Sequence, residues 1–350
     1  MLPLSRLFFL ACEMRHFRNQ TNTHMWDILL SVLAGLVLFL FAITNLSETI
    51  RGAMGDGAQK WLLRFTSNTF SSILTGLVVT ILLDSSSAVI ILTIVLVNAG
   101  LLSFRQAMGI VLGANIGTTI SSQLIALDVG RYSPVLLLIG FVLVLLSKSE
   151  RLTHSGRIIL YFGILFFGLF TMEEAVGPLK NHEYVHQILH NIESPLVGAA
   201  VGALVTLVIQ SSSATVGMAI ILAKKGIIGL AGGIAVMLGA ELGTCSDTLL
   251  ATIRGSRQAI KTGLFHLIFN ALSIVLGLIF FFPFLRLIAW IGQNLPIEQS
   301  VANAHMLFNA LGVLIFVWFL PVFEHVLNRL LPDRPQEQTL VSPLKPDAWA

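Results

Sequence analysis

The chain has 350 residues, of which 55% are hydrophobic and only 11% are charged, and its mean hydropathy is +0.85. Soluble domains carry roughly 25% charged residues, and several apolar runs here approach the roughly 20 residues that cross a bilayer. The composition therefore excludes a soluble globular domain and predicts an all-α polytopic membrane protein. The net charge of +3 does not indicate a nucleic-acid partner, because basic residues of membrane proteins collect in cytoplasmic loops.

The first half of the chain contains one segment that no ordinary span explains. An N-terminal extension (1–25) precedes a predicted transmembrane helix (26–46) and a polar link (47–64). The next segment, 65–99, is too long for one span and, with Asp84 and three serines at its centre, too polar for two. A re-entrant hairpin of two half-helices fits it, because non-helical backbone survives at membrane depth only where protein or water satisfies it.

The later segments repeat this order and then close the chain. We group them as repeat 1 (26–157, hairpin 65–99), repeat 2 (158–282, hairpin 195–225), final interfacial and transmembrane helices (283–325) and a disordered polar tail (326–350). Within these groups we expect a helix interrupted by Gly113 and Gly117 (105–128), a shorter span (132–147), a basic loop (148–157), a helix (158–176), a polar loop (180–194), a second interrupted helix (227–253), two closing spans (262–282 and 302–323) and an interfacial helix (284–295).

One stretch of sequence occurs twice, at a fixed offset of 126 residues. Asp84-Ser85-Ser86-Ser87-Ala88 corresponds to Gln210-Ser211-Ser212-Ser213-Ala214, and Gly113-Ala114-Asn115-Ile116-Gly117-Thr118 corresponds to Gly239-Ala240-Glu241-Leu242-Gly243-Thr244. Without a gap, 15 of 43 positions are identical between 76–118 and 202–244, which indicates an internal duplication. If each hairpin returns to its own side, each repeat crosses the membrane three times. The second copy then enters from the opposite face, which predicts an inverted-topology repeat, as in many secondary transporters.

The serine triplets favour an ion site at the predicted helix breaks. A break exposes backbone N–H groups at the N-terminus of a half-helix, where the helix dipole also favours an oxyanion such as phosphate. The carbonyls at the other end of a break, together with Ser and Thr oxygens, suit a hard cation such as Na⁺. The alternative is that the serines only allow close packing or bond across helices, and the glycines at i, i+4 and i+8 around Gly113 also fit a packing face.

Two acidic residues lie within apolar segments, where ionisable groups are costly. Repeat 1 has an acid on the hairpin, Asp84, and an amide on the next helix, Asn115, whereas repeat 2 has Gln210 and Glu241. Two carboxylates near one cavity could bind cations or carry a proton. Each could instead be a single buried carboxyl group that is held neutral.

Two histidine motifs leave their roles open. The segments that begin at His266 and His305 both read His-x-x-Phe-Asn, so His and Asn share a helix face, for hydrogen bonds between helices or for substrate contact. His182-Glu183-Tyr184-Val185-His186 matches the H-E-x-x-H zinc motif. It lies in a short polar loop without an evident zinc scaffold, which favours a solvated helix over a membrane metalloprotease.

These motifs together resemble the type II sodium–phosphate cotransporter family in its short bacterial form, over about residues 26–325. The resemblance implies a Na⁺-coupled phosphate transporter, not an enzyme, in the plasma (inner) membrane, with no cofactor beyond Na⁺ as coupling ion and no partner beyond its ions and the bilayer; the oligomeric state stays open. It implies phosphate-binding residues at Ser85, Ser86, Ser87, Gln210, Ser211, Ser212 and Ser213. It implies Na⁺ ligands among Asp84, Asn115, Thr118, Thr119, Gln210, Ser211, Glu241 and Thr244.

Two positions depart from the family pattern. Asp84 stands where the family has Gln, and Glu241 stands where it has Asn. Both changes add negative charge. Transport of another oxyanion, or proton coupling through Asp84 and Glu241, is therefore the alternative to Na⁺-coupled phosphate transport.

Overall fold

The computed structural model describes residues 4–54, 57–127, 129–181, 191–253 and 255–333. Within these ranges the chain is almost entirely helical and has no β-strand. Five helical segments are long and apolar enough to cross a membrane, which confirms a helical multi-pass protein: Met25–Ile50, Phe104–Ala126, Glu150–Lys180, Arg257–Ile279 and Ile297–Leu330.

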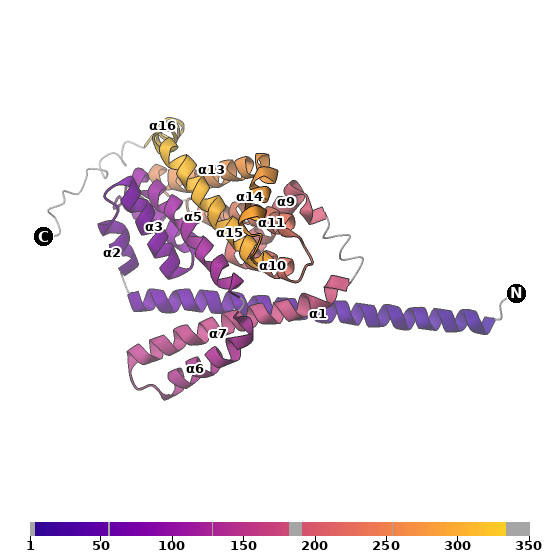
Figure 1. The fold of residues 1–350 in the computed structure, drawn as a ribbon. Helices are drawn as coiled ribbons and strands as arrows, with labels where there is room; N and C mark the ends of the chain where they lie inside the picture. Colours follow the sequence, from indigo (N-terminus) through magenta and orange to yellow (C-terminus); the bar gives the residue numbers. More distant parts are fainter. Residues whose placement is uncertain (1–3, 55–56, 128, 182–190, 254, 334–350) are drawn as a thin grey trace.

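The helices fall into two similar sets followed by a closing group (Figure 1). The first set is α1 (Leu4–Met54), α2 (Gly57–Arg64), α3 (Thr69–Leu83), α4 (Ser86–Asn98), α5 (Phe104–Ala126) and α6 (Ser133–Leu146). The second is α7 (Glu150–Val176), α9 (Pro195–Ile209), α10 (Ser212–Lys224), α11 (Leu230–Gly243), α12 (Cys245–Leu250) and α13 (Arg257–Ile279). The closing helices are α14 (Phe281–Ile291), α15 (Ile297–Phe316) and α16 (Leu320–Leu330).

The duplication is visible in the helix boundaries. Adding 126 to the bounds of α3 gives the bounds of α9, and adding 126 to those of α4 gives those of α10. The short turns after α4 and α10 also match, because each contains a glycine with positive φ, Gly100 at 72° and Gly226 at 68°. The two copies therefore fold into the same local structure as well as sharing sequence.

Several boundaries differ from the sequence-based predictions. The predicted interruption of 105–128 is wrong, because α5 runs unbroken through Gly113 and Gly117. In repeat 2 the helix does pause, at Thr244 between α11 and α12. There the Glu241 carbonyl accepts hydrogen bonds from the Thr244 hydroxyl and the Asn270 amide, which ties it to side chains. Most of the predicted basic loop 148–157 is helical, since α7 begins at Glu150, and much of the link 47–64 lies in α1 and α2.

The α5 glycines serve close packing instead. α3 packs along α5, and α9 packs along α11. A Cβ on Gly113 would overlap the Ile73 carbonyl oxygen and lie 2.7 Å from the backbone nitrogen of Leu77. A Cβ on Gly239 would meet the carbonyl group of Ala199 in the same way, with the carbonyl carbon 2.6 Å away. Backbones in such contact let these helices bury their polar faces together, as small residues do between membrane helices.

A second layer is formed by α1, α6 and α7, which pack mainly on one another (Figure 1). Glycines again allow the contact between α1 and α7. A Cβ on Gly35 would lie 2.6 Å from the Gly168 carbonyl oxygen, and one on Gly168 would lie 2.7 Å from that of Gly35. The four short helices α3, α4, α9 and α10 lie outside this layer, where α3 and α4 pack on α5, and α9 and α10 pack on α11.

The glycine contacts yield a first prediction. Gly239→Val should destabilise the protein by about 3 kcal/mol, the upper part of the usual range for overpacking, because two helix backbones cannot yield as a side chain can. Gly52→Val is the matched control, since nothing lies within 4 Å of a Cβ at Gly52. The measurement is thermal unfolding of both purified variants in detergent. Equal melting temperatures would contradict the packing described here.

Candidate functional site at two helix breaks

Each copy contains a helix that stops and restarts within two residues. Asp84 ends α3 with φ 49°, and Gln210 ends α9 with φ 60°; among the described residues these are the non-glycine residues with positive φ. Ser85 and Ser211 follow with φ −155° and −147°, so a left-handed residue and an extended one separate the two half-helices. A left-handed non-glycine residue costs on the order of 1–3 kcal/mol and clusters at functional sites.

The first serine of each triplet caps the helix that follows. The Ser85 Oγ accepts from the Ala88 N–H at 3.2 Å, and the Ser211 Oγ accepts from the Ala214 N–H at 3.2 Å. The next two residues open α4 and α10, so their N–H groups have no carbonyl within the helix to bond to. They lie at the positive ends of the two helix dipoles. The breaks thus present paired amide donors from 86–87 and 212–213.

The two copies lie against each other at these breaks. α4 packs against α12 of the second copy, and α10 packs against α5 of the first. The Ser87 side chain lies close to the Asp247 carboxylate of the other copy. Ser212 and Ser213 are only 4% and 6% exposed, whereas 84–87 are half-buried and Gln210 is exposed. The structure therefore brings the serines of both triplets toward the other copy, with the second triplet deeper.

Two carboxylates, those of Asp84 and Asp247, lie at the breaks. The comparison of the two repeats in the sequence identified only Asp84. Asp84 accepts a hydrogen bond from the Ser121 hydroxyl on α5. The residue that corresponds to Ser121 at offset 126 is Asp247, so repeat 2 has its acid on the helix and an amide, Gln210, on the hairpin. Gln210 donates to the Leu207 carbonyl at 2.7 Å and to the Ser246 hydroxyl at 3.4 Å. Extending the aligned window three residues past 118 and 244 would have revealed Asp247.

Four other predicted cation ligands lie on α5 or, for Thr244, at the junction of α11 and α12, and each bonds to a backbone carbonyl three or four residues earlier. The hydroxyls of Thr118, Thr119 and Thr244 donate to the carbonyls of Ala114, Ile116 and Glu241, and the Asn115 amide donates to that of Val111. A hydroxyl that donates in this way keeps its lone pairs, and Asn115 keeps its carbonyl oxygen. All four side chains are buried, and their free oxygens can act as acceptors or cation ligands.

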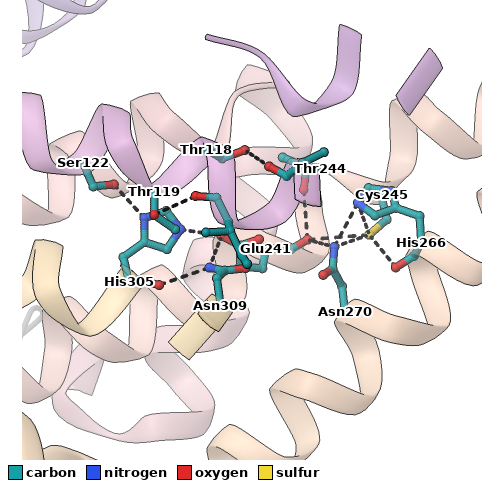
Figure 2. Close-up of polar contacts among 12 residues, drawn as sticks. Thr118, Thr119, Ser122, Glu241, Thr244, Cys245, His266, Asn270, His305 and Asn309 are labelled. Atoms are coloured by element: carbon teal, nitrogen blue, oxygen red, sulfur yellow. Dashed lines mark hydrogen bonds and ion pairs between the residues drawn. The ribbon is translucent and has the colours of Figure 1, made fainter. Parts of the chain in front are cut away.

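Glu241 is the point where the two His-x-x-Phe-Asn motifs meet (Figure 2). Its Oε1 lies 2.6 Å from His305 Nε2 and 3.5 Å from Asn309 Nδ2, both on α15. Its backbone carbonyl accepts from Asn270 Nδ2 on α13 at 3.1 Å. Both motifs therefore make hydrogen bonds between helices, the first of the two roles left open by the sequence, and α11 is tied to α13 and α15 at one residue.

The zinc-like motif at 182–186 lies outside the described residues. Among the residues that the structure describes, no three His, Cys, Asp or Glu side chains are grouped so that they could hold a metal ion.

One difference between the copies involves a buried threonine. In repeat 2 the Thr206 hydroxyl donates to the Thr215 hydroxyl at 2.8 Å, and both side chains are buried. The corresponding residue in repeat 1, Thr80, is fully buried and its hydroxyl has no hydrogen-bond partner, because Val89 takes the place of Thr215. Thr80 and Thr206 thus occupy corresponding positions of the two copies, but only the Thr206 hydroxyl is hydrogen-bonded.

This difference yields a second prediction. Thr206→Val should lower the free energy of unfolding by about 1 kcal/mol, the usual net value of a hydrogen bond. Thr80→Val should leave it unchanged or raise it, because it removes a buried hydroxyl that is unpaired in the protein. Thermal unfolding of both variants makes the comparison. A loss of stability in Thr80→Val as large as that in Thr206→Val would show that Thr80 has a partner.

Fold and site together define a helical multi-pass membrane protein in which each of two copies contains an interrupted helix. The model of the Na⁺/Pi-cotransporter family matches the chain twice, over residues 38–174 and 175–316. The chain belongs to this family. The two matches meet at 174 and 175, near the end of α7, so each half of the chain matches the same family model, which agrees with the internal duplication.

Three relatives give the range of similarity. The uncharacterized protein YqeW of Bacillus subtilis is 30% identical over 310 residues, which cover 88% of this chain and 99% of YqeW. The putative inorganic phosphate export protein YjbB of Escherichia coli is 26% identical over 325 residues, which cover 92% of this chain but only 59% of YjbB. The sodium-dependent phosphate transport protein 2A of Mus musculus is 33% identical over 98 residues, 27% of this chain and 15% of that protein. No solved structure matches the chain significantly.

Proposed function

We propose that the protein is a secondary active transporter that couples Na⁺ to the movement of inorganic phosphate across the plasma (inner) membrane, with its site at the two helix breaks. The observation that carries the proposal is a pair of serine-rich helix N-termini, one in each copy, with α12 packed against α4 and its Ser246 hydroxyl bonded to Gln210 at the other break. Membership of the Na⁺/Pi-cotransporter family supports phosphate as the substrate. Direction, uptake or export, follows from the gradients and is not part of the proposal.

The amides and hydroxyls at the breaks are suited to hold the anion. Phosphate binds readily where N–H groups and a helix dipole converge. Here 86–87 and 212–213 supply such groups from two helices, and the hydroxyls of Ser86, Ser212 and Ser213 add donors. Ser85 and Ser211 act as caps and hold these donors in place.

The carboxylates at the breaks explain why an anion would need a cation. Asp84 and Asp247 lie close to the serines of the site, and each adds a negative charge that repels phosphate. Two unit charges 4 Å apart interact by about 4 kcal/mol near a protein surface. A Na⁺ bound between a carboxylate and the hydroxyl oxygen of Thr118, Thr119 or Thr244 would offset this repulsion. Each ion then increases the affinity for the other, since coupling between sites is reciprocal.

The duplicated fold supports alternating access by an inverted repeat. The contact of α4 with α12 and of α10 with α5 is reciprocal, as expected for two copies related by a pseudo-two-fold axis. α3–α4 and α9–α10 would then be re-entrant hairpins that enter from opposite faces, because each half-helix is too short to span the bilayer. Rocking of one copy against the other would expose the breaks to each side in turn.

The proposal gives a third prediction, on two substitutions at one residue. Ser212→Ala removes a hydroxyl, and Ser212→Pro also removes the N–H at the first position of α10, where proline is tolerated. The preceding Ser211 is extended, as a residue before proline requires. We expect Na⁺-dependent uptake of radiolabelled phosphate into proteoliposomes to fall in the first variant and to be lost in the second.

Glu150→Pro is the control, because Glu150 is the exposed first residue of α7 and lies away from the breaks. It should transport like the wild type. If folded wild-type protein moves no phosphate, the assignment of phosphate as the substrate is wrong. Sulfate or another oxyanion would then be tested with Na⁺ and with pH gradients. Full transport by Ser212→Pro would overturn the site.

A further inference from the structure

We propose that His266 and His305 are paired positioning residues of the site at the breaks. Each holds, through one hydroxyl, the helix segment that places a carboxylate at the first break (84–85). This role deepens the proposed function and rests on it, because the carboxylates are the groups proposed to hold Na⁺. The two rings lie on α13 and α15, helices that the offset of 126 residues does not relate.

α13 and α15 have equivalent surroundings in the two copies. α13 packs on α4, which follows the first break, and on α12 of repeat 2. α15 packs on α10, which follows the second break, and on α5 of repeat 1. Because α12 corresponds to the end of α5, exchanging the two copies exchanges the neighbours of α13 with those of α15. α15 therefore takes the place in repeat 1 that α13 takes in repeat 2.

The two histidines make the same hydrogen bond in these surroundings. His305 Nδ1 lies 2.6 Å from the Ser122 Oγ on α5, and His266 Nδ1 lies 2.8 Å from the Thr248 Oγ1 on α12 (Figure 2 shows the first). Ser122 and Thr248 correspond to each other at the offset of 126. All four side chains are at most 2% exposed, so water does not compete for these bonds.

Each ring is also held at its second nitrogen. His305 Nε2 lies 2.6 Å from Glu241 Oε1, and His266 Nε2 lies 3.0 Å from Asn270 Nδ2. A ring that is bonded at both nitrogens cannot turn without losing a bond, and buried polar groups are costly to leave unpaired. The two rings are thus fixed supports for the hydroxyls that they contact.

The residue before each of these hydroxyls belongs to the first break. Ser121 precedes Ser122, and its hydroxyl donates to the Asp84 carboxylate. Asp247 precedes Thr248, and its carboxylate lies close to the serines of the break and accepts from the Thr248 N–H at 2.6 Å. Successive residues of a helix point about 100° apart. A hydroxyl held by its histidine therefore fixes the rotation of that turn and the position of the carboxylate beside it.

The two copies depend on this bond to different degrees. Ser122 lies in α5, a continuous helix of 23 residues, whereas Thr248 lies in α12, which has only six residues and follows the pause at Thr244. Helices shorter than about 12 residues are marginal without outside contacts. The direction of α12, and so the position of Asp247, depends more on its histidine than α5 does.

The test measures the Na⁺ dependence of phosphate uptake into proteoliposomes. Thr248→Val removes the hydroxyl and keeps the shape, and we expect the half-saturating Na⁺ concentration to rise about fivefold, the ratio that one net hydrogen bond provides. Flux at saturating Na⁺ should stay near that of the wild type, since both carboxylates remain. Thr248→Ser keeps the hydroxyl and should restore the wild-type value, and Ser122→Ala should give a smaller rise.

Two further variants separate positioning from general stability. His266→Leu, alone or combined with Thr248→Val, should give the same rise as Thr248→Val, because effects that act through one bond do not add. Thr262→Val is the matched control. Its hydroxyl is buried on α13 one turn before His266 and donates to the Gln258 carbonyl. It should lower the melting temperature but leave the Na⁺ dependence unchanged.

The proposal is overturned if Thr248→Val and Ser122→Ala have the same half-saturating Na⁺ concentration as the wild type. It is also overturned if Thr262→Val raises that concentration as much as Thr248→Val does, because the effect would then follow from lost stability alone.

A second readout needs no transport. Na⁺ that binds the folded protein raises its melting temperature, and choline chloride serves as the salt control. The Na⁺ concentration that gives a set rise should be higher in Thr248→Val than in the wild type, and equal concentrations would overturn the positioning role. If this difference is found but the wild type moves no phosphate, the proposed function fails and the positioning role stands. A wild type that responds to Na⁺ in neither assay overturns both.

Discussion

The constraint on which this structure depends is the interruption of two helices inside an apolar layer. Unpaired backbone groups are costly there, so a break persists only where other groups satisfy it. Asp84 and Gln210 take the left-handed conformation, and Ser85 and Ser211 cap the helices that follow. The close glycine contacts hold α3 against α5 and α9 against α11, and so fix the half-helix that leads into each break. At each break two backbone N–H groups have no partner within the helix. These N–H groups form the proposed binding site.

The duplication gave each copy a helix break, and the polar residues around the two breaks now differ. The helix boundaries of α3–α4 and α9–α10 have been kept, but the polar partners have not. The acid lies on the hairpin in repeat 1, as Asp84, and on the following helix in repeat 2, as Asp247. Glu241 has no acidic counterpart, since Asn115 occupies that position, and it has acquired His305 as partner. The fold is thus nearly symmetric while its charges are not, which is compatible with the proposed binding of both an anion and a cation.

The sequence predicted the two helix breaks because the signal is local: a polar serine triplet within an apolar run, present twice. It predicted less where the outcome depends on packing between distant helices. Gly113 and Gly117 could break a helix or line a contact, and only the position of α3 decides between the two. The pairing of Glu241 with His305 joins residues 64 positions apart, and no offset relates them. Asp247 was missed for a simpler reason, because it lies just past the aligned window.

The measurement that tests the account most directly is an electron cryo-microscopy map of the protein prepared with Na⁺ and phosphate, beside one prepared without phosphate. The account predicts additional density between the first residues of α4 and of α10, within hydrogen-bonding distance of the amides of 86–87 and 212–213. Phosphate density elsewhere in the protein, or at one break with the other distant from it, would contradict the claim that the two copies meet to form a single site.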